Sequence, residues 1–212
     1  MKTLVILISG RGSNMQALVK AKLPVDRIVV ISNNPDAEGI KVAATLDIQT
    51  TCIDNSVFSN REAFDAALAE EIDRHQPELI ALAGFMRILT DDFVLRYQGR
   101  LMNIHPSLLP AFPGLHTHQR ALRAGVKIHG CTVHFVTPAL DHGPIVIQAA
   151  IPVLPTDTDK TLAERVLQQE HRIYPQAVRW FIHNQISISR NTVTASETSV
   201  HDLVIYSPGL QE

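Results

Sequence analysis

Alternation of short apolar runs with helical segments over the first hundred residues is the feature that most constrains the fold. The runs TLVILIS, RIVVIS, TTCID, ELIALAG and RLMNIH, which begin at residues 3, 27, 50, 78 and 100, have the length and content of buried strands. Helical patterns or short connections separate them. Such alternation implies right-handed β–α–β crossovers. We therefore predict an α/β fold with a Rossmann-like, open, mostly parallel twisted sheet.

The second half of the chain has a different pattern. IHGCTVHFVT from residue 128 and PIVIQAAIPV from residue 144 are strand-like runs with little helix between them. They predict an antiparallel C-terminal extension of the sheet, followed by a long C-terminal helix from about residue 158 to about residue 183. We expect a single domain over residues 1–183, and a peripheral tail, hairpin-like or loosely ordered, over residues 184–212.

The composition favours small-molecule ligands. With 19 Lys and Arg against 21 Asp and Glu, the net charge of -2 gives no reason to expect nucleic acid or an anionic membrane as partner. The two cysteines, Cys52 and Cys131, exclude a disulfide framework and favour a cytoplasmic location. The N-terminal apolar run soon enters a glycine loop, unlike a signal peptide, and no stretch approaches the ~18 apolar residues of a membrane span.

The segment SGRGSN, residues 9–14, lies where the first strand meets the first helix. Free backbone N–H groups and the helix dipole favour an anion at such a junction. The segment lacks the third glycine of a dinucleotide fingerprint and the lysine of a P-loop, and the second strand ends in Ser and Asn, which disfavours NAD. We expect a phosphate monoester at Gly12, Ser13 and Asn14, with Arg11 as a further contact; a tight turn with a capped helix is the alternative.

Asn103 and His105 lie two residues apart at the end of the fifth run, so their side chains point to the same face of the sheet. Ligands of open α/β sheets bind beyond the carboxyl ends of the strands. An amide beside an imidazole is suited to donating hydrogen bonds to a carbonyl oxygen that gains charge as an acyl carbon becomes tetrahedral. Asp141, in LDHGP, supplies a carboxylate that would keep the imidazole protonated. The pattern predicts acyl transfer.

Other interpretations of these residues stay open. A single histidine at a strand end is more often structural than catalytic. His116 and His118 have a spacing that occurs in zinc sites, but no second pair of ligands accompanies them, so we expect no metal. Ser107 lacks the G-x-S-x-G elbow of a nucleophile, and we therefore expect direct attack on the acyl group without a covalent intermediate.

Seven segments between residues 3 and 181 together resemble the phosphoribosylglycinamide formyltransferase family: LISGRGSNMQAL, REAFD, LAGFMRIL, NIHPSLLPAFPGLHTH, HGCTVHFVT, LDHGPI and QQEHRIYP. The resemblance implies transfer of the formyl group of 10-formyltetrahydrofolate to the amine of glycinamide ribonucleotide in de novo purine (IMP) biosynthesis. It implies that Asn103 and His105 stabilise the oxyanion, and that Asp141 keeps His105 protonated and relays protons. Residues 1–100 would then be the phosphate-binding half of the domain, and residues 101–183 the catalytic and folate-binding half.

The same resemblance assigns ligand contacts. The nucleotide phosphate is expected at Gly12, Ser13 and Asn14, and the rest of the nucleotide at Leu167, Gln168, Gln169 and Glu170, with Glu170 at a ribose hydroxyl. The folate is expected at Arg61, Met86, Arg87, Ile88, Leu89, Asn103, Thr137, Pro138, Ala139, Leu140 and Asp141. Two residues are particular to this chain: Arg11 occupies a variable position, and His142 stands where a small residue is common in the family.

Three alternatives remain. Methionyl-tRNA formyltransferase normally has a C-terminal RNA-binding domain, for which the tail is too short, and formyltetrahydrofolate hydrolase has an N-terminal regulatory domain, which we do not expect because the first strand begins at Thr3. A non-catalytic nucleotide-binding module is the third. It predicts that Asn103, His105 and Asp141 do not converge on one site. We expect a monomer or a homodimer.

Overall fold

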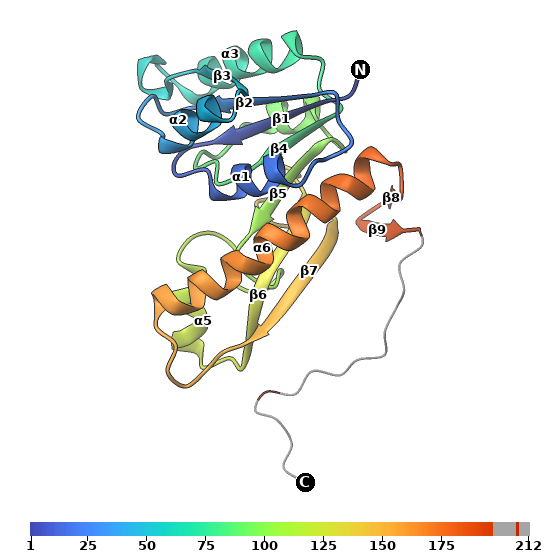
Figure 1. The fold of residues 1–212 in the computed structure, drawn as a ribbon. Coiled ribbons are helices and arrows are strands. Elements are labelled where there is room, and N and C mark those ends of the chain that lie inside the picture. Colours follow the sequence, from blue (N-terminus) through green and yellow to red (C-terminus); the bar gives the residue numbers. More distant parts are fainter. Residues whose placement is uncertain (197–206, 208–212) are drawn as a thin grey trace.

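The computed structural model describes residues 1–196 and residue 207, and Figure 1 shows their fold. The strands are β1 (Thr3–Ile8), β2 (Arg27–Ser32), β3 (Gln49–Cys52), β4 (Leu79–Leu82), β5 (Leu101–His105), β6 (Ile128–Phe135), β7 (Ile145–Pro152), β8 (Ile186–Ser189) and β9 (Thr192–Ala195). The helices are α1 (Ser13–Lys20), α2 (Glu38–Thr45), α3 (Arg61–Arg74), α4 (Asp91–Arg96), α5 (Thr117–Ala124) and α6 (Asp159–Ile182), with a short 3₁₀ turn at Asn55–Val57.

The strands form one sheet in the order β3-β2-β1-β4-β5-β6-β7-β9-β8. The first five strands run parallel, β6 is antiparallel to β5, and β7 is antiparallel to β6. The predicted fold class is therefore confirmed, including the antiparallel extension and the long C-terminal helix. The chain passes from β1 outward to β3 and then returns to the other side of β1 at β4. This reversal opens a crevice beyond the carboxyl ends of β1 and β4, where such sheets bind ligands.

Helices cover both faces of the sheet because its central strands are apolar on both sides. All six residues of β1 are buried; Leu4, Ile6 and Ile8 join the core under α1, α2 and α6, whereas Val5 and Leu7 join the core under α3 and α4. Each such side chain stabilises the fold by about 1.5–3 kcal/mol relative to an exposed one. This rigid double core fixes the ends of β1, β4 and β5, from which the site is built.

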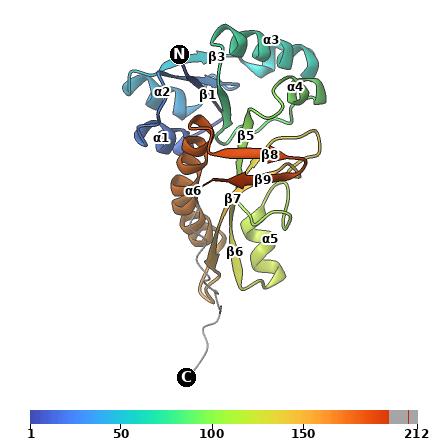
Figure 2. The same cartoon turned by 90° about the vertical axis from the view of Figure 1, so that its right-hand side faces the viewer.

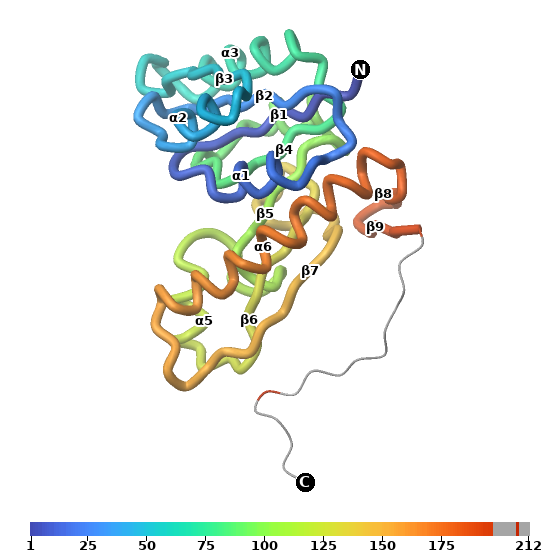
Figure 3. Tube along the Cα trace, viewed as in Figure 1, coloured from blue at the N-terminus to red at the C-terminus, as the bar shows by residue number. Residues whose placement is uncertain are grey.

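The long helix α6 crosses the sheet and packs along β6 and β7, as the chain trace in Figure 3 shows. It begins with a capping box in which the side chains of Thr158 and Thr161 each accept from the other's backbone N–H. The buried Tyr174 hydroxyl lies 3.0 Å from the Leu82 carbonyl oxygen and 2.9 Å from that of Met102. The helix is thus fixed to β4 and β5, with Glu170 one turn before this contact.

Helix α5, between the proline-rich loop and β6, was not predicted, because His116 precedes it in a left-handed conformation without a side-chain cap. Residues 186–195 form the β8–β9 hairpin, which joins the sheet edge through pairing of Thr192 with Ile145 (Figure 2). Apart from residue 207, the tail beyond residue 196 lies outside the described residues, and the division at residues 183 and 184 stays a prediction.

Candidate active site

Four polar side chains, those of Asn103, His105, His134 and Asp141, meet beside the carboxyl end of β5. Asn103 and His105 come from β5 itself, His134 lies directly opposite Asn103 on β6, and Asp141 comes from the loop between β6 and β7. The three side chains predicted to be catalytic therefore converge, which argues against the non-catalytic alternative.

The His105 imidazole is held between two oxygen acceptors. Its Nε2 donates to the Phe112 carbonyl oxygen at 3.0 Å, and its Nδ1 lies 3.6 Å from Asp141 Oδ2. The His105 and Asp141 side chains are each only 7% exposed. Both ring nitrogens therefore face oxygens, and a neutral ring would direct its lone pair at one of them.

His134 orients the amide of Asn103. The Nδ1–H of His134 donates to the Phe135 carbonyl oxygen at 3.0 Å, so its Nε2 accepts from Asn103 Nδ2 at 3.3 Å. Burial lowers the pKa of His134, against smaller raising effects of the Phe135 bond and the Asp141 charge, and so keeps the ring neutral for this role. One N–H of Asn103 is thereby used, and the second remains for a ligand. Sequence reasoning missed His134, because its position depends on the register between β5 and β6.

The loop after His105 is fixed by buried hydrogen bonds. Thr132 Oγ1 donates to the Ser107 carbonyl oxygen at 2.7 Å and accepts from the Leu109 N–H at 3.0 Å, and Gln148 Nε2 donates to the Leu109 carbonyl oxygen at 2.9 Å. The Leu109–Pro110 bond within this loop is cis. These bonds hold the loop that brings the Phe112 carbonyl oxygen to His105. Like the contact of His134 with Asn103, the contact of Phe112 with His105 was not predicted from the sequence.

The glycine loop lies at the carboxyl end of β1, two strands from β5 and therefore about 10 Å away. Gly12, in a left-handed conformation, precedes α1, so the first backbone N–H groups of this helix are free of intrahelical partners. Gly39 of α2 approaches so closely that a Cβ on Gly12 would lie 2.9 Å from the Gly39 Cα. The loop thus has the geometry of an anion site at a helix N-terminus.

The side chain of Asn14 is directed into the protein. Its Nδ2 donates to Glu170 Oε2 at 2.7 Å, and both residues are buried. Burial raises the pKa of Glu170, and the bond from Asn14 partly opposes this shift. Asn14 can therefore offer its backbone N–H to an anion while its side chain holds Glu170. Of the other α6 residues expected at the nucleotide, Gln168 is exposed, and Leu167 and Gln169 are half-buried.

The residues expected to contact folate fall into two loops and one helix end. Met86 and Ile88 are 65% and 63% exposed, whereas Leu89 is buried in the core under α3 and α4. The Arg87 guanidinium lies over the ring of Phe64. Phe64 is one helical turn after Arg61, the first residue of α3. The third group, Thr137, Pro138, Ala139 and Leu140, forms the half-exposed to exposed loop that leads to Asp141.

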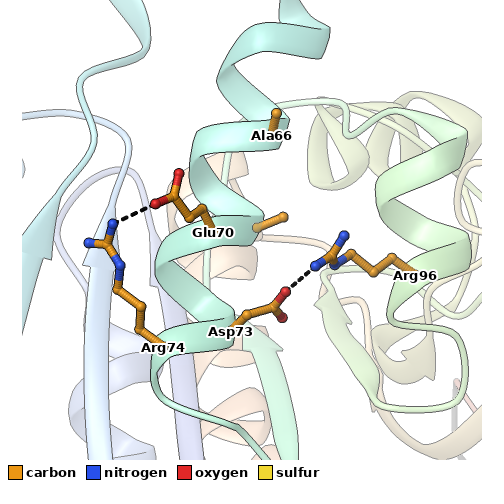
Figure 4. A pocket seen from close by; sticks show the side chains of 6 residues that line it. Ala66, Glu70, Asp73, Arg74 and Arg96 are labelled. Carbon is orange, nitrogen blue, oxygen red and sulfur yellow. Dashed lines mark hydrogen bonds and ion pairs between the residues drawn. The ribbon is translucent and has the colours of Figure 1, made fainter.

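Two hollows lie in very different places. One, of about 420 Å³, lies beside Asp141 and is lined by Pro113, Gly114, Ala139, Leu140 and His142. The other, of about 570 Å³, lies between the second half of α3 and the end of α4 (Figure 4), and is lined by Ala66, Ala69, Glu70, Asp73, Arg74 and Arg96. Its charges are already paired, Glu70 with Arg74 and Asp73 with Arg96, and none of the predicted site residues lines it, whereas two of them line the first hollow.

Among residues 1–196 and 207, no group of three or more His, Cys, Asp or Glu is arranged to hold a metal ion. His118, the second histidine of the HTH segment, contacts another histidine, His129. The distance from His118 Nδ1 to His129 Nε2 is 3.2 Å. Burial lowers the pKa of His129 to about 4, so at least this ring is neutral. Within the described chain, no helix has the length and apolar character needed to cross a membrane.

Several known proteins resemble this chain in sequence and in fold. Residues 2–178 match the family described as formyl transferase. The chain is 47% identical to the phosphoribosylglycinamide formyltransferase of Escherichia coli (strain K12), over 89% of this chain and 91% of that protein. It is 43% identical to the trifunctional purine biosynthetic protein adenosine-3 of Drosophila melanogaster over 89% of its own length, but spans only 14% of that protein. Glycinamide ribonucleotide transformylase 1 from Symbiobacterium toebii superimposes with a TM-score of 0.89, at 43% identity, covering 93% and 95% of the two chains.

Proposed function

Because the chain belongs to the formyl transferase family, we propose that it transfers the formyl group of 10-formyltetrahydrofolate to the amine of 5'-phosphoribosylglycinamide in de novo purine biosynthesis. The relatives confirm the resemblance stated from the sequence. The observation that carries the proposal is the meeting of Asn103, His105 and Asp141, two strands from a loop with anion-binding geometry. A substrate with a phosphate at one end and an amine at the other fits this separation.

In the proposed reaction, the substrate amine attacks the formyl carbon and forms a new C–N bond, and the bond from that carbon to N10 of the folate breaks when the resulting tetrahedral intermediate collapses. The formyl oxygen carries negative charge in the tetrahedral intermediate. The free amide N–H of Asn103 and the cationic ring of His105 stabilise that charge. Asp141 balances the imidazolium, and the proton lost by the amine is relayed to the departing N10. No serine or cysteine nucleophile is needed.

The Phe112 carbonyl has a particular place in this mechanism. It accepts the Nε2–H of His105, the donor that would otherwise serve the formyl oxygen. We propose that the formyl oxygen replaces this carbonyl as the acceptor when the folate binds. The Thr132 hydroxyl holds Ser107 and Leu109, the earlier residues of this loop, so in the proposed exchange only the part of the loop around Phe112 moves.

The phosphate of the nucleotide is proposed to lie at Gly12, Ser13 and Asn14, with Glu170 at a ribose hydroxyl. The support is the free helix N-terminus and the bond that directs Glu170. The folate is proposed to lie against the exposed Met86 and Ile88, the Arg87 region and the hollow beside Asp141. The proposed location is the cytoplasm, in keeping with the free cysteines Cys52 and Cys131, and the proposed assembly is a monomer or homodimer.

The test is a formyl-transfer assay that follows loss of the formyl group from 10-formyltetrahydrofolate with and without 5'-phosphoribosylglycinamide. We expect loss that depends strictly on the nucleotide; equal loss without it would identify a hydrolase. His105→Ala is expected to reduce kcat by at least about 10²-fold with little change in KM, since it removes a donor to the oxyanion. The matched control His183→Ala, at an exposed position after α6, should leave kcat unchanged.

A further inference from the structure

The loop between β6 and β7, residues 136–144, carries Asp141 and is closely packed at its base. There the Phe135 N–H donates to the Pro144 carbonyl oxygen at 2.9 Å, and a Cβ on Gly143 would lie 1.8 Å from the Phe135 carbonyl oxygen, so only glycine fits. The tip of the loop is different, because Leu140 is 55% exposed. Since packing holds the tip so little, hydrogen bonds must determine its shape.

Asp141 has a backbone conformation that its residue type does not favour. Its φ is +56°, in the left-handed region, and it occupies the third position of a turn from Ala139 to His142, where glycine or asparagine is usual. The carboxylate makes aspartate necessary here for the proposed reaction. Neighbouring contacts must therefore hold this conformation.

His142 makes two hydrogen bonds, one on each side of Asp141. Its backbone N–H donates to the Ala139 carbonyl oxygen at 3.2 Å, which fixes the peptide plane that follows Asp141. Its ring Nδ1–H donates to the Leu140 carbonyl oxygen at 2.6 Å, which fixes the peptide plane that precedes Asp141. Because φ and ψ are the rotations between these two planes, the two bonds together set the direction in which the Asp141 side chain leaves the backbone.

We propose that His142 is a positioning residue that aims the Asp141 carboxylate. In the held position, Asp141 Oδ2 accepts the Gly114 N–H at 2.8 Å and lies 3.6 Å from His105 Nδ1. A carbonyl oxygen only accepts, so Nδ1 of His142 carries its proton whether the ring is neutral or charged, and the contact persists in both states. The positioning of Asp141 by His142 does not depend on which reaction the protein catalyses, whereas the effect of that positioning on catalysis rests on the proposed function.

Three substitutions separate the hydrogen bond from the bulk of the ring. His142→Asn places an amide nitrogen as many bonds from the backbone as Nδ1, so it should donate to the Leu140 carbonyl. His142→Gln places its amide nitrogen one bond further away, and His142→Ala removes the donor. The first readout is the amide signal of Gly114 in ¹⁵N–¹H NMR spectra, because this N–H reports directly on the position of Asp141. The second is steady-state formyl transfer.

We expect the Gly114 amide signal to shift, and its hydrogen exchange to accelerate, in His142→Ala and His142→Gln but not in His142→Asn. In the same two variants kcat should fall by about three- to tenfold, the effect of one lost hydrogen bond, with the KM for the nucleotide unchanged. His142→Asn should restore kcat to within about twofold of the wild type.

An unmoved Gly114 signal in His142→Ala overturns the proposal, as does an equal loss of kcat in the Asn and Gln variants. If His142→Ala does not fold, the comparison of Asn with Gln decides, since both keep a polar side chain. If the wild-type protein transfers no formyl group to the nucleotide, the proposed function fails, and the Gly114 signal still decides the role of His142.

Discussion

Replacement of Asn103 by alanine tests whether the site stabilises an oxyanion. One N–H of the Asn103 amide donates to His134 Nε2 at 3.3 Å, so only the second N–H can serve the substrate. The loss is therefore that of a single donor, which in comparable sites costs about 10²–10³-fold in kcat, or about 2.7–4 kcal/mol. The bond to His134 is long, so its removal should cost less than about 1 kcal/mol of stability. For a chain of 212 residues this corresponds to a decrease of Tm by about 2–4 °C at most.

The assay combines steady-state formyl transfer with thermal melting of the same preparations. We expect Asn103→Ala to lose at least about 10²-fold in kcat, with KM values for both substrates changed by less than about threefold. Asn103→Asp should lose at least as much, because a carboxylate repels both the oxyanion and Asp141. A loss in Asn103→Ala smaller than tenfold, or one matched by an equal rise in KM, would refute the assignment of Asn103 to the transition state.

Two further predictions concern the nucleotide side of the site. We expect Gly12→Ala to raise the KM for the nucleotide and spare folate affinity, because a Cβ there would lie 2.9 Å from the Gly39 Cα and the φ of Gly12 is +73°. Gly10→Ala is the matched control, since a Cβ on Gly10 would meet nothing within 4 Å. An equal effect of both substitutions on the KM for the nucleotide would contradict the assignment. Burial raises the pKa of Glu170 above the ordinary value of 4.5, so the stability that this residue contributes is complete below that value and is lost as pH rises through the raised pKa. Glu170→Gln should therefore remove this decline in thermal melts recorded as the pH is raised from 4.5, and a decline equal to that of the wild type would contradict the role of burial.

The fold was predictable because its central strands are buried on both faces. A run such as residues 3–8, with all six residues apolar or β-branched, fits only a strand between two layers of helices, and β1 is that strand. The same argument placed Asn103 and His105 at the end of β5. It did not reveal His134 as the partner of Asn103, because β6 is buried along both faces and its sequence lacks the apolar–polar alternation from which a register with β5 could be inferred. Helix α5 was missed because its first turn lacks the usual capping side chain.

The position of Asp141 could not be derived from strand geometry at all. In the register of β5 and β6, Phe135 pairs with Met102, and the next residue, Val136, donates its N–H to the Leu101 carbonyl oxygen at 2.9 Å. The loop therefore leaves β6 beside the beginning of β5, and it must fold back along the strand to bring Asp141 to His105 at the other end. The core holds the end of β5 and with it His105, whereas the conformation of this loop depends on hydrogen bonds such as those made by His142 and Gly114. The imidazole is thus fixed by the fold and its carboxylate partner by local contacts, so substitutions at the tip of this loop, residues 137–142, should alter catalysis without altering stability to the same degree.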